Sequence, residues 1–207
     1  GEYTIDPATN KVTFTPTDKT YVGKVQPAKV QAEDENGTKV STTYTPTIVG
    51  VTPTSTPATT TDVQGKTQES TVSFEAGKTT IDGKEKSVKI DPDTYTLLGE
   101  NGKPAPEVPA KDPKGNVIGK YTLKTEDGKD PVVVFTPTDK TYAGPVQPVT
   151  VQAQDKNGTA VTTTYTPNIT PVKPTAKGTT SEGAQGQEQS GTPTFTEGNT
   201  KTPIDPQ

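Results

Sequence analysis

The sequence has no cysteine, histidine, methionine or tryptophan among its 207 residues. Without cysteine it cannot form a disulfide, and it offers no thiol for catalysis or for binding a metal. Without histidine it also lacks the side chain that most often serves as a general base and as a metal ligand. We therefore predict that the chain is not an enzyme, and that it has no catalytic, cofactor-binding or metal-binding residue and no cofactor.

Long apolar runs and strong charge are also absent. No stretch approaches the roughly 18 apolar residues of a membrane-spanning helix, so we expect no membrane insertion in this segment. The net charge is only −4, and a mildly acidic chain is a poor partner for nucleic acid, which attracts basic patches. The hydrophobic fraction is only 26%, as in many disordered chains. However, the low net charge and the abundant β-branched threonine favour a folded β protein, with disorder confined mostly to linkers.

The sequence repeats itself at a spacing of 121 residues. About 29 of the 41 residues that start at Phe14 are identical, without a gap, to those that start at Phe135. Phe74 and Phe195 align at the same offset. A fixed period of this kind indicates tandem structural repeats.

The phase of the repeat predicts the domain organisation. We expect residues 1–51 to be the C-terminal part of one repeat unit, residues 62–172 a complete unit, and residues 183–207 the N-terminal part of the next. Residues 52–61 and 173–182 are rich in proline and threonine. Because proline fixes its own φ and restricts the residue before it, we predict that both are extended, semi-rigid linkers.

Alternation of period two, the pattern of half-buried strands, recurs along the chain. Val149, Val151 and Ala153 alternate with polar residues, and similar patterns predict strands near Val12–Phe14, Val40–Tyr44, Val72–Phe74, Val88–Ile90, Tyr95–Leu98, Val117–Leu123, Val132–Phe135 and Val161–Tyr165. Asn36-Gly37, Asn157-Gly158 and Asp82-Gly83 predict tight turns of type I′. We therefore predict an all-β fold of tandem β-sandwich repeats, immunoglobulin-like in shape, joined by Pro/Thr-rich linkers and elongated.

Several phrases resemble the repeat units of the CshA-type fibrillar adhesins of streptococci and related Gram-positive bacteria. The back half of the repeat carries FTPTDKTY, VQPxxVQAxDxNGT and TTTYTP, and the front half carries VQGKTQ and IDPDTYTLLGENGKPAPEVPAKDPKGNVIGKYTL. The resemblance covers nearly the whole chain. It implies that many repeats are strung into a surface fibril anchored to the cell wall, and that fibronectin binding resides mainly in a separate, non-repetitive region.

On this basis we predict an extracellular structural stalk on the bacterial cell surface, which projects a distal binding region. Its partners would be the neighbouring repeats of the same chain. Host fibronectin or other cells would be bound through regions outside this sequence. The alternative hypothesis is that the repeats themselves act as a binding module for host matrix protein or partner cells.

Two groups of acidic residues suggest chemistry but have a plainer interpretation. Asp91 and Asp93 offer paired carboxylates, as glycoside hydrolysis requires, although IDPDT is more typical of a turn. Asp34–Gly37 and Asp155–Gly158 faintly resemble the start of a calcium loop, but neither continues with the required ligands. The hairpin interpretation is favoured for both loops.

Three further hypotheses concern bonds and surfaces. A Lys–Asn or Lys–Asp isopeptide bond would replace disulfides in such a stalk, and Lys89 and Lys120 lie in predicted strands, although an exposed lysine is the ordinary case. The tail, residues 183–207, of one chain could complement the head, residues 1–51, of the next by strand addition. Four tyrosines recur in register and are expected to be core or corner residues whose hydroxyls bind backbone groups: Tyr21, Tyr44, Tyr142 and Tyr165.

Overall fold

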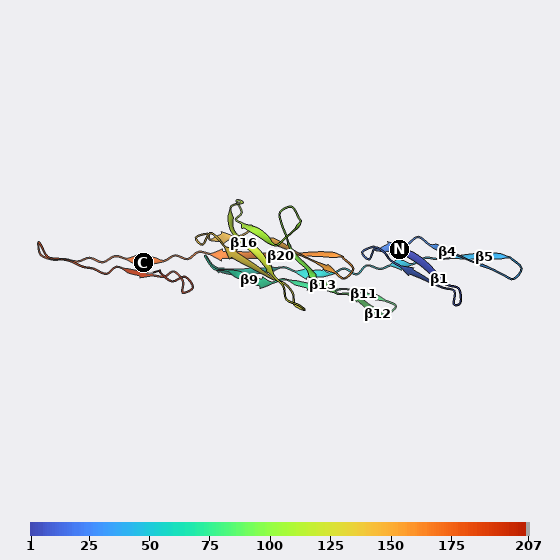
Figure 1. Ribbon diagram of the computed structural model, residues 1–207. Helices are drawn as coiled ribbons and strands as arrows, with labels where there is room; N and C mark the ends of the chain where they lie inside the picture. Colours follow the sequence, from blue (N-terminus) through green and yellow to red (C-terminus); the bar gives the residue numbers. More distant parts are fainter. Residues whose placement is uncertain (206–207) are drawn as a thin grey trace. The chain divides into compact units, whose positions relative to one another are not determined.

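The computed structural model describes residues 1–205, which form strands and turns and no helix (Figure 1). This result confirms the all-β prediction. Contacts divide the chain into two compact units. The first unit comprises Gly1–Ser55, Phe74–Tyr95 and Gln152–Thr162, and the second comprises Thr56–Ser73, Thr96–Val151 and the residues from Thr163 on.

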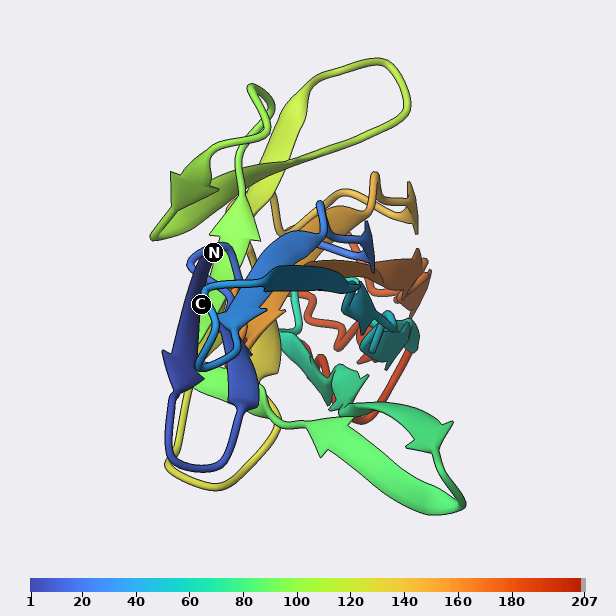
Figure 2. The ribbon, with the colours of Figure 1, turned by 90° about the vertical axis from the view of Figure 1, so that its right-hand side faces the viewer.

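The first unit consists of antiparallel strand pairs. β1 pairs with β2, β3 with β6, β4 with β5, and β11 with β12; β1 and β2 are the two dark-blue strands joined by a loop in Figure 2. The strands of this unit are β1 (Glu2–Asp6), β2 (Lys11–Thr15), β3 (Gly23–Lys24), β4 (Ala28–Glu33), β5 (Lys39–Tyr44), β6 (Thr47–Ile48), β11 (Gly77–Ile81) and β12 (Lys84–Val88).

The second unit contains strands of two larger sheets. One sheet has the order β15-β16-β17-β9, and the other has the order β14-β13-β19-β20-β18 with β8 paired to β20. The strands of this unit are β8 (Ala58–Val63), β9 (Gln68–Thr71), β14 (Pro104–Ala105), β15 (Glu107–Lys111), β16 (Val117–Lys124), β17 (Val132–Pro137), β18 (Gly144–Pro145), β21 (Thr175–Lys177) and β22 (Thr194–Thr196). Strands with residues in both units are β7 (Thr54–Thr56), β10 (Ser73–Glu75), β13 (Ile90–Leu98), β19 (Val149–Asp155) and β20 (Ala160–Thr170).

The core of the second unit lies where the two larger sheets meet. Tyr121 of β16 stands edge-on to Tyr165 of β20, with ring centroids 6.1 Å apart, and contacts Phe135 of β17 at 5.7 Å. All three rings are almost completely buried. In β19 every second residue is buried, and these residues include Val149 and Val151. The predicted alternation is therefore confirmed, and two facing sheets with buried inner faces form a β-sandwich.

The same residues are more exposed in the first copy of the repeat. Tyr44 corresponds to Tyr165, but it is 39% exposed where Tyr165 is 0% exposed. Strands β8 and β9, which lie beside β20 and β17, have no counterpart in residues 1–51. Burying one large apolar side chain contributes about 1.5–3 kcal/mol. Strands β8 and β9 therefore contribute to the core around Tyr165.

The turns at Asn36-Gly37 and Asn157-Gly158 differ from the predicted type I′ geometry. Only the glycine of each pair has a positive φ, 86° for Gly37 and 90° for Gly158. In the first loop the N–H of Gly37 donates to the carbonyl of Asp34 over 3.0 Å. A type I turn followed by a left-handed glycine makes a three-residue loop with a bulge, which replaces the two-residue turn. Asp82-Gly83 has positive φ at both residues, 50° and 72°, and confirms the type I′ prediction there.

The two segments predicted as linkers are extended, but they also contain paired strands. Residues 52–61 include β7 and most of β8, and residues 173–182 include β21. β8 pairs with β20, and β21 pairs with β22. The sequence missed these strands because threonine and proline dominate the segments and their partners lie far away in the chain. The boundaries of the repeat units stay a prediction.

Candidate functional site

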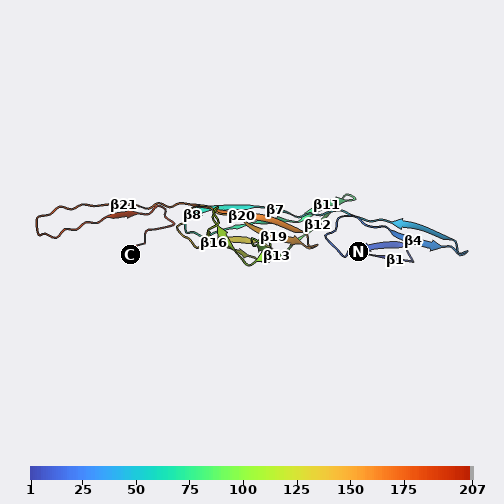
Figure 3. The same ribbon diagram turned by 90° about the horizontal axis from the view of Figure 1, so that it is seen from above.

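Strand β8, most of which lies in the predicted linker 52–61, runs parallel to β20, the last strand of the predicted complete unit. The two strands lie side by side in Figure 3. Ala58 is opposite Tyr165 at one end of this ladder, and Val63 is opposite Thr170 at the other. The chain therefore enters the ladder at the Ala58 end and leaves it at the Thr170 end. Ten other strand pairs within residues 1–205 are antiparallel, so this parallel pair is unusual in the fold. They are β1–β2, β3–β6, β4–β5, β9–β17, β11–β12, β13–β14, β15–β16, β16–β17, β18–β20 and β21–β22.

A buried glutamine connects the ladder to the neighbouring sheet. Gln68 opens β9, and only 5% of its surface is exposed. Its amide Nε2 donates to the carbonyl of Asn168 over 3.0 Å, and its Oε1 accepts from the Thr60 hydroxyl over 2.6 Å. The three residues come from β9, β20 and β8. One side chain thus satisfies polar groups of both ladder strands, as a buried amide requires.

The direction of these hydrogen bonds follows from the groups involved. A backbone carbonyl can only accept, so the Gln68 NH₂ must face Asn168 and the Gln68 carbonyl must face Thr60. The Thr60 hydroxyl has a single proton, which it donates to Gln68 Oε1. The Tyr165 hydroxyl, 2.7 Å from Thr60 Oγ1, must therefore donate to Thr60. Burial raises the pKa of Tyr165, so the phenol keeps the proton that this chain of hydrogen bonds needs.

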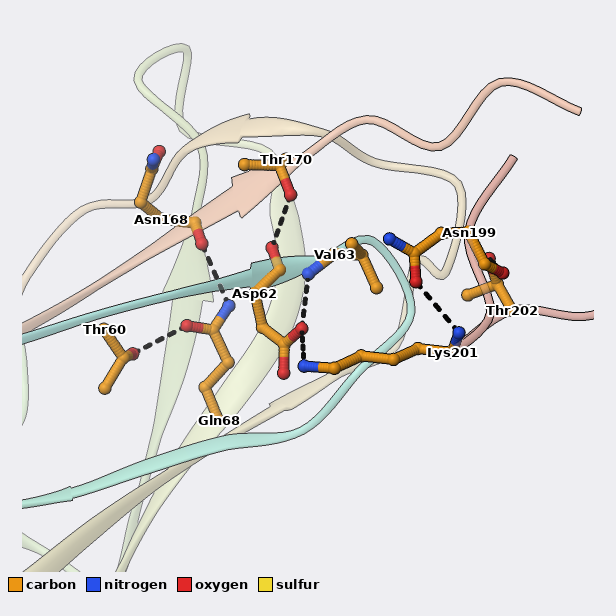
Figure 4. A network of polar contacts seen from close by, with 9 residues as sticks. All are labelled: Thr60, Asp62, Val63, Gln68, Asn168, Thr170, Asn199, Lys201 and Thr202. Atoms are coloured by element: carbon orange, nitrogen blue, oxygen red, sulfur yellow. Dashed lines mark hydrogen bonds and ion pairs between the residues drawn. The ribbon is translucent and has the colours of Figure 1, made fainter. Parts of the chain in front are cut away.

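The far end of the ladder is fastened by residues just beyond β8. The N–H of Gln64 donates to the Thr170 carbonyl over 2.9 Å, and Gln64 Oε1 accepts from the N–H of Val172 over 2.8 Å. The Thr170 hydroxyl donates to the Asp62 carbonyl over 3.1 Å (Figure 4). These contacts extend the pairing of the two strands past the last residue of the ladder.

Asp62 also contacts Lys201, which lies in the segment, residues 183–207, predicted to open the next repeat unit. Its Oδ1 accepts from Lys201 Nζ over 2.7 Å and from the N–H of Val63 over 2.8 Å (Figure 4). The hydrogen bond from Lys201 is the main reason why the pKa of Asp62 is lowered, with the Val63 N–H contributing as well. The Asp62 side chain is 24% exposed and that of Lys201 is 59% exposed, so the pair lies at the surface.

Sequence reasoning missed this network, although the repeat carried a signal for it. At an offset of 121 residues, Thr60 and Gln68 correspond to Ser181 and Gln189, which preserve a hydroxyl and an amide. The Ser181 hydroxyl donates to Gln189 Oε1 over 3.0 Å. In the third copy both residues are exposed, and among the described residues up to 205 no strand equivalent to β20 pairs with this segment. The hydroxyl–glutamine pair is therefore an internal feature of the front half of the repeat.

The paired carboxylates are not brought together in a shared site. Both residues lie in strand β13, so the turn predicted at IDPDT is wrong. Asp91 Oδ1 accepts from Lys156 Nζ over 2.6 Å, whereas Asp93 is exposed. Asp34 Oδ1 accepts from the N–H groups of Asn36 and Thr38 over 2.9 and 2.8 Å. Asp155 Oδ1 does the same with Asn157 and Thr159, 2.9 Å in each case. These bonds support the hairpin interpretation of both loops, because they hold the carboxylates inside the turns.

The lysines considered for a crosslink lie at the surface. Lys89 is exposed, and Lys120 forms an ion pair with Glu107 in which its side chain is 44% exposed. Neither has the buried setting that the isopeptide hypothesis required. In residues 1–205 no group of three or more acidic residues is arranged to hold a metal ion. No helix of this part of the chain is long and apolar enough to cross a membrane.

Two of the four repeated tyrosines are corner residues, as predicted. The hydroxyl of Tyr21 donates to the carbonyl of Lys24 over 2.7 Å, and that of Tyr142 donates to the carbonyl of Pro145 over 2.6 Å. Tyr165 lies in the core, as expected, but its hydroxyl binds the side chain of Thr60 rather than a backbone group. Tyr44 packs edge-on to Tyr3 with ring centroids 6.3 Å apart.

The family model of the surface adhesin CshA repetitive domain matches residues 1–48, 50–169 and 171–207. The chain therefore belongs to this family, and the resemblance seen in its repeated phrases is confirmed. The family places the chain in the repeat region of a cell-surface adhesin, within an adhesive and structural family rather than one of enzymes. A search of curated proteins gave no match.

Proposed function

We propose that the repeats of this adhesin chain form a structural stalk, which is anchored to the cell wall and projects a distal binding region from the bacterial surface. The observation that carries this proposal is the parallel pairing of β8 with β20. Because the first and last strands of the repeat run in the same direction, the chain enters and leaves at opposite ends of one ladder. Such a module is suited to addition in series.

The same geometry suits a chain under tension. A pull on the two chain ends draws β8 backward and β20 forward along their shared ladder. All the hydrogen bonds between Ala58–Val63 and Tyr165–Thr170 are then loaded together. The contacts of Gln68 and Gln64 bridge the same two strands, so they resist the same displacement. No disulfide can share this load, because the sequence has no cysteine.

The test is to delete or replace the repeats in the surface protein that carries this chain. Deletion of the repeats should reduce adhesion of whole cells to immobilised fibronectin, because the distal region no longer reaches beyond the cell surface. Replacement by an unrelated folded stalk of equal length should restore adhesion. If the replacement fails although the protein is displayed, the repeats themselves bind, as the alternative hypothesis holds. The purified chain is the control, and we expect no saturable binding to fibronectin.

A further inference from the structure

The strand that follows each repeat pairs with an opening strand of the next repeat, and this happens twice. β21 pairs with β22, with Ala176 opposite Phe195. β7 pairs with β10, and both strands lie 121 residues earlier than β21 and β22. Because the pairing recurs at the repeat spacing, it is a property of the repeat and not of one place in the chain. The joint between repeats is thus an ordered structure that contains a pair of β-strands.

A glycine beyond the second strand of each joint lies against the main chain of the preceding residues. A Cβ placed on Gly198 would be 2.5 Å from the carbonyl carbon of Lys173, and one on Gly77 would be 2.6 Å from that of Thr52. Both members of the first pair lie 121 residues after those of the second. The restriction is steric, since the atoms approached are backbone and cannot move aside as a flexible side chain would.

The turn after Gly198 points the side chain of Lys201 toward the end of the preceding repeat. Asn199 Oδ1 accepts from the N–H of Lys201 over 2.9 Å (Figure 4). The Asn199 carbonyl accepts from the N–H of Thr202, also over 2.9 Å. This turn holds Lys201 where its ammonium reaches Asp62 at 2.7 Å. The surface beside it is a groove of about 610 Å³, which is lined by Gln64, Val172 and Ile204 among other residues.

The Asp62–Lys201 ion pair belongs to the joint formed by β21 and β22. The close approach of a glycine to the main chain occurs at both joints. At an offset of 121 residues, Asp62 corresponds to Gly183 and Lys201 corresponds to Thr80. The middle copy instead carries the exposed β11–β12 hairpin in this region. The charged contact therefore distinguishes one joint from another, on top of a backbone contact that the joints share.

We infer that the segment from Gly198 to Thr202 is a docking element, which seats the opening of one repeat on the end of the preceding repeat, with Asp62 as its acceptor. The partner of this surface is the next repeat of the same chain. The inference concerns the folding of the joint and does not depend on the stalk role, since a chain that carried no load would have the same docked turn.

Amide hydrogen exchange of the full chain tests the docking element. Asp62→Asn removes the charge but keeps an oxygen to accept from the N–H of Val63. We expect it to speed exchange at Asn199–Thr202 roughly two- to fivefold at low salt, the range of a surface ion pair. Gly198→Ala should speed exchange there and in β21–β22 about tenfold or more, because the added methyl group overlaps the backbone. High salt should reproduce the effect of Asp62→Asn in the unchanged chain.

Two matched variants serve as controls. Lys156→Gln breaks the Lys156–Asp91 ion pair, whose side chains are 56% and 24% exposed, close to the 59% and 24% of Lys201 and Asp62. Gly178→Ala adds a methyl group where no atom lies within 4 Å. Neither should alter exchange at Asn199–Thr202. The inference is overturned if Asp62→Asn and Gly198→Ala leave exchange in this turn unchanged, or if they speed exchange in the Tyr165–Thr170 ladder to the same extent.

Discussion

At the scale of single residues, Gln68 is the buried side chain that connects the two strands of the parallel ladder. It is buried, and its amide is the partner of one group on each strand of the parallel ladder. The ion pairs, in contrast, are mostly exposed on both sides, as in Lys124–Glu69, and such pairs contribute about 0–1 kcal/mol. The stability of the repeat should therefore respond to neutral hydrogen-bonding groups more than to surface charge.

Gln68→Leu tests this expectation. The leucine leaves the Thr60 hydroxyl and the Asn168 carbonyl without their partner, and we expect the free energy of unfolding to fall by about 1–3 kcal/mol. The matched control is Gln189→Leu, which changes the same residue in the exposed third copy and should cost much less. Chemical denaturation of both variants measures the difference. Equal losses in the two variants would contradict the role given to Gln68.

The direction of the hydrogen bonds predicts that Tyr165→Phe lowers the free energy of unfolding less than Gln68→Leu does. This change removes the donor to Thr60 Oγ1, but Thr60 can still donate to Gln68. We expect a loss of about 0.5–1.5 kcal/mol, the net value of one hydrogen bond. The same change at the half-exposed Tyr44 is the control, and denaturation curves compare the two. If Tyr165→Phe costs more than Gln68→Leu, the order of donors and acceptors is wrong.

At the scale of elements, local pattern and long-range pairing were not equally visible in the sequence. The alternation of β19 and the Asp82-Gly83 turn depend on neighbouring residues, and both were predicted. Most of β8 was assigned to a linker because its partner strand lies 107 residues away, as between Ala58 and Tyr165. Its threonines do not alternate with large apolar residues. Period-two reasoning cannot detect a strand that is specified by a distant strand and by one buried glutamine.

The parallel ladder predicts that resistance to force depends on where the repeat is pulled. End-to-end tension loads the β8–β20 bonds together, whereas tension between the N-terminus and residue 164 loads them one at a time from the Ala58 end. Thr164→Cys gives an attachment point on an exposed residue, and no native cysteine competes with it. We expect a several-fold lower unfolding force in the second geometry. Single-molecule force spectroscopy measures both forces, which report the rate of unfolding.

The control for this measurement is the same cysteine variant pulled from its two ends, which should behave as the unchanged chain does. If the force is the same in both geometries, the ladder does not carry the load and another part of the repeat sets the unfolding barrier.

At the scale of the whole molecule, every resolved pKa shift moves away from neutrality. Seven aspartates have a lowered pKa, and for six of them the largest cause is a hydrogen bond from a side chain. The seventh is Asp34, whose pKa is lowered chiefly by the backbone N–H of Thr38. Four tyrosines have a raised pKa, in each case mainly because burial disfavours the phenolate. The sequence has no histidine to titrate between these two groups.

These shifts predict a flat stability profile between about pH 5 and pH 9. A lowered aspartate pKa contributes stability that is present above the ordinary value of about 3.9, and it is lost as the pH falls through the folded values. A raised tyrosine pKa contributes stability that is present below about 10, and it is lost as the pH rises through the folded values. Thermal unfolding of the untagged chain, measured across this range, should give a constant Tm with losses only at the two extremes. A step in Tm between pH 6 and 8 would contradict the prediction, because the sequence has no histidine to cause it. Asp62→Asn should move only the acid limb, since the substitution removes one carboxylate and leaves every tyrosine in place.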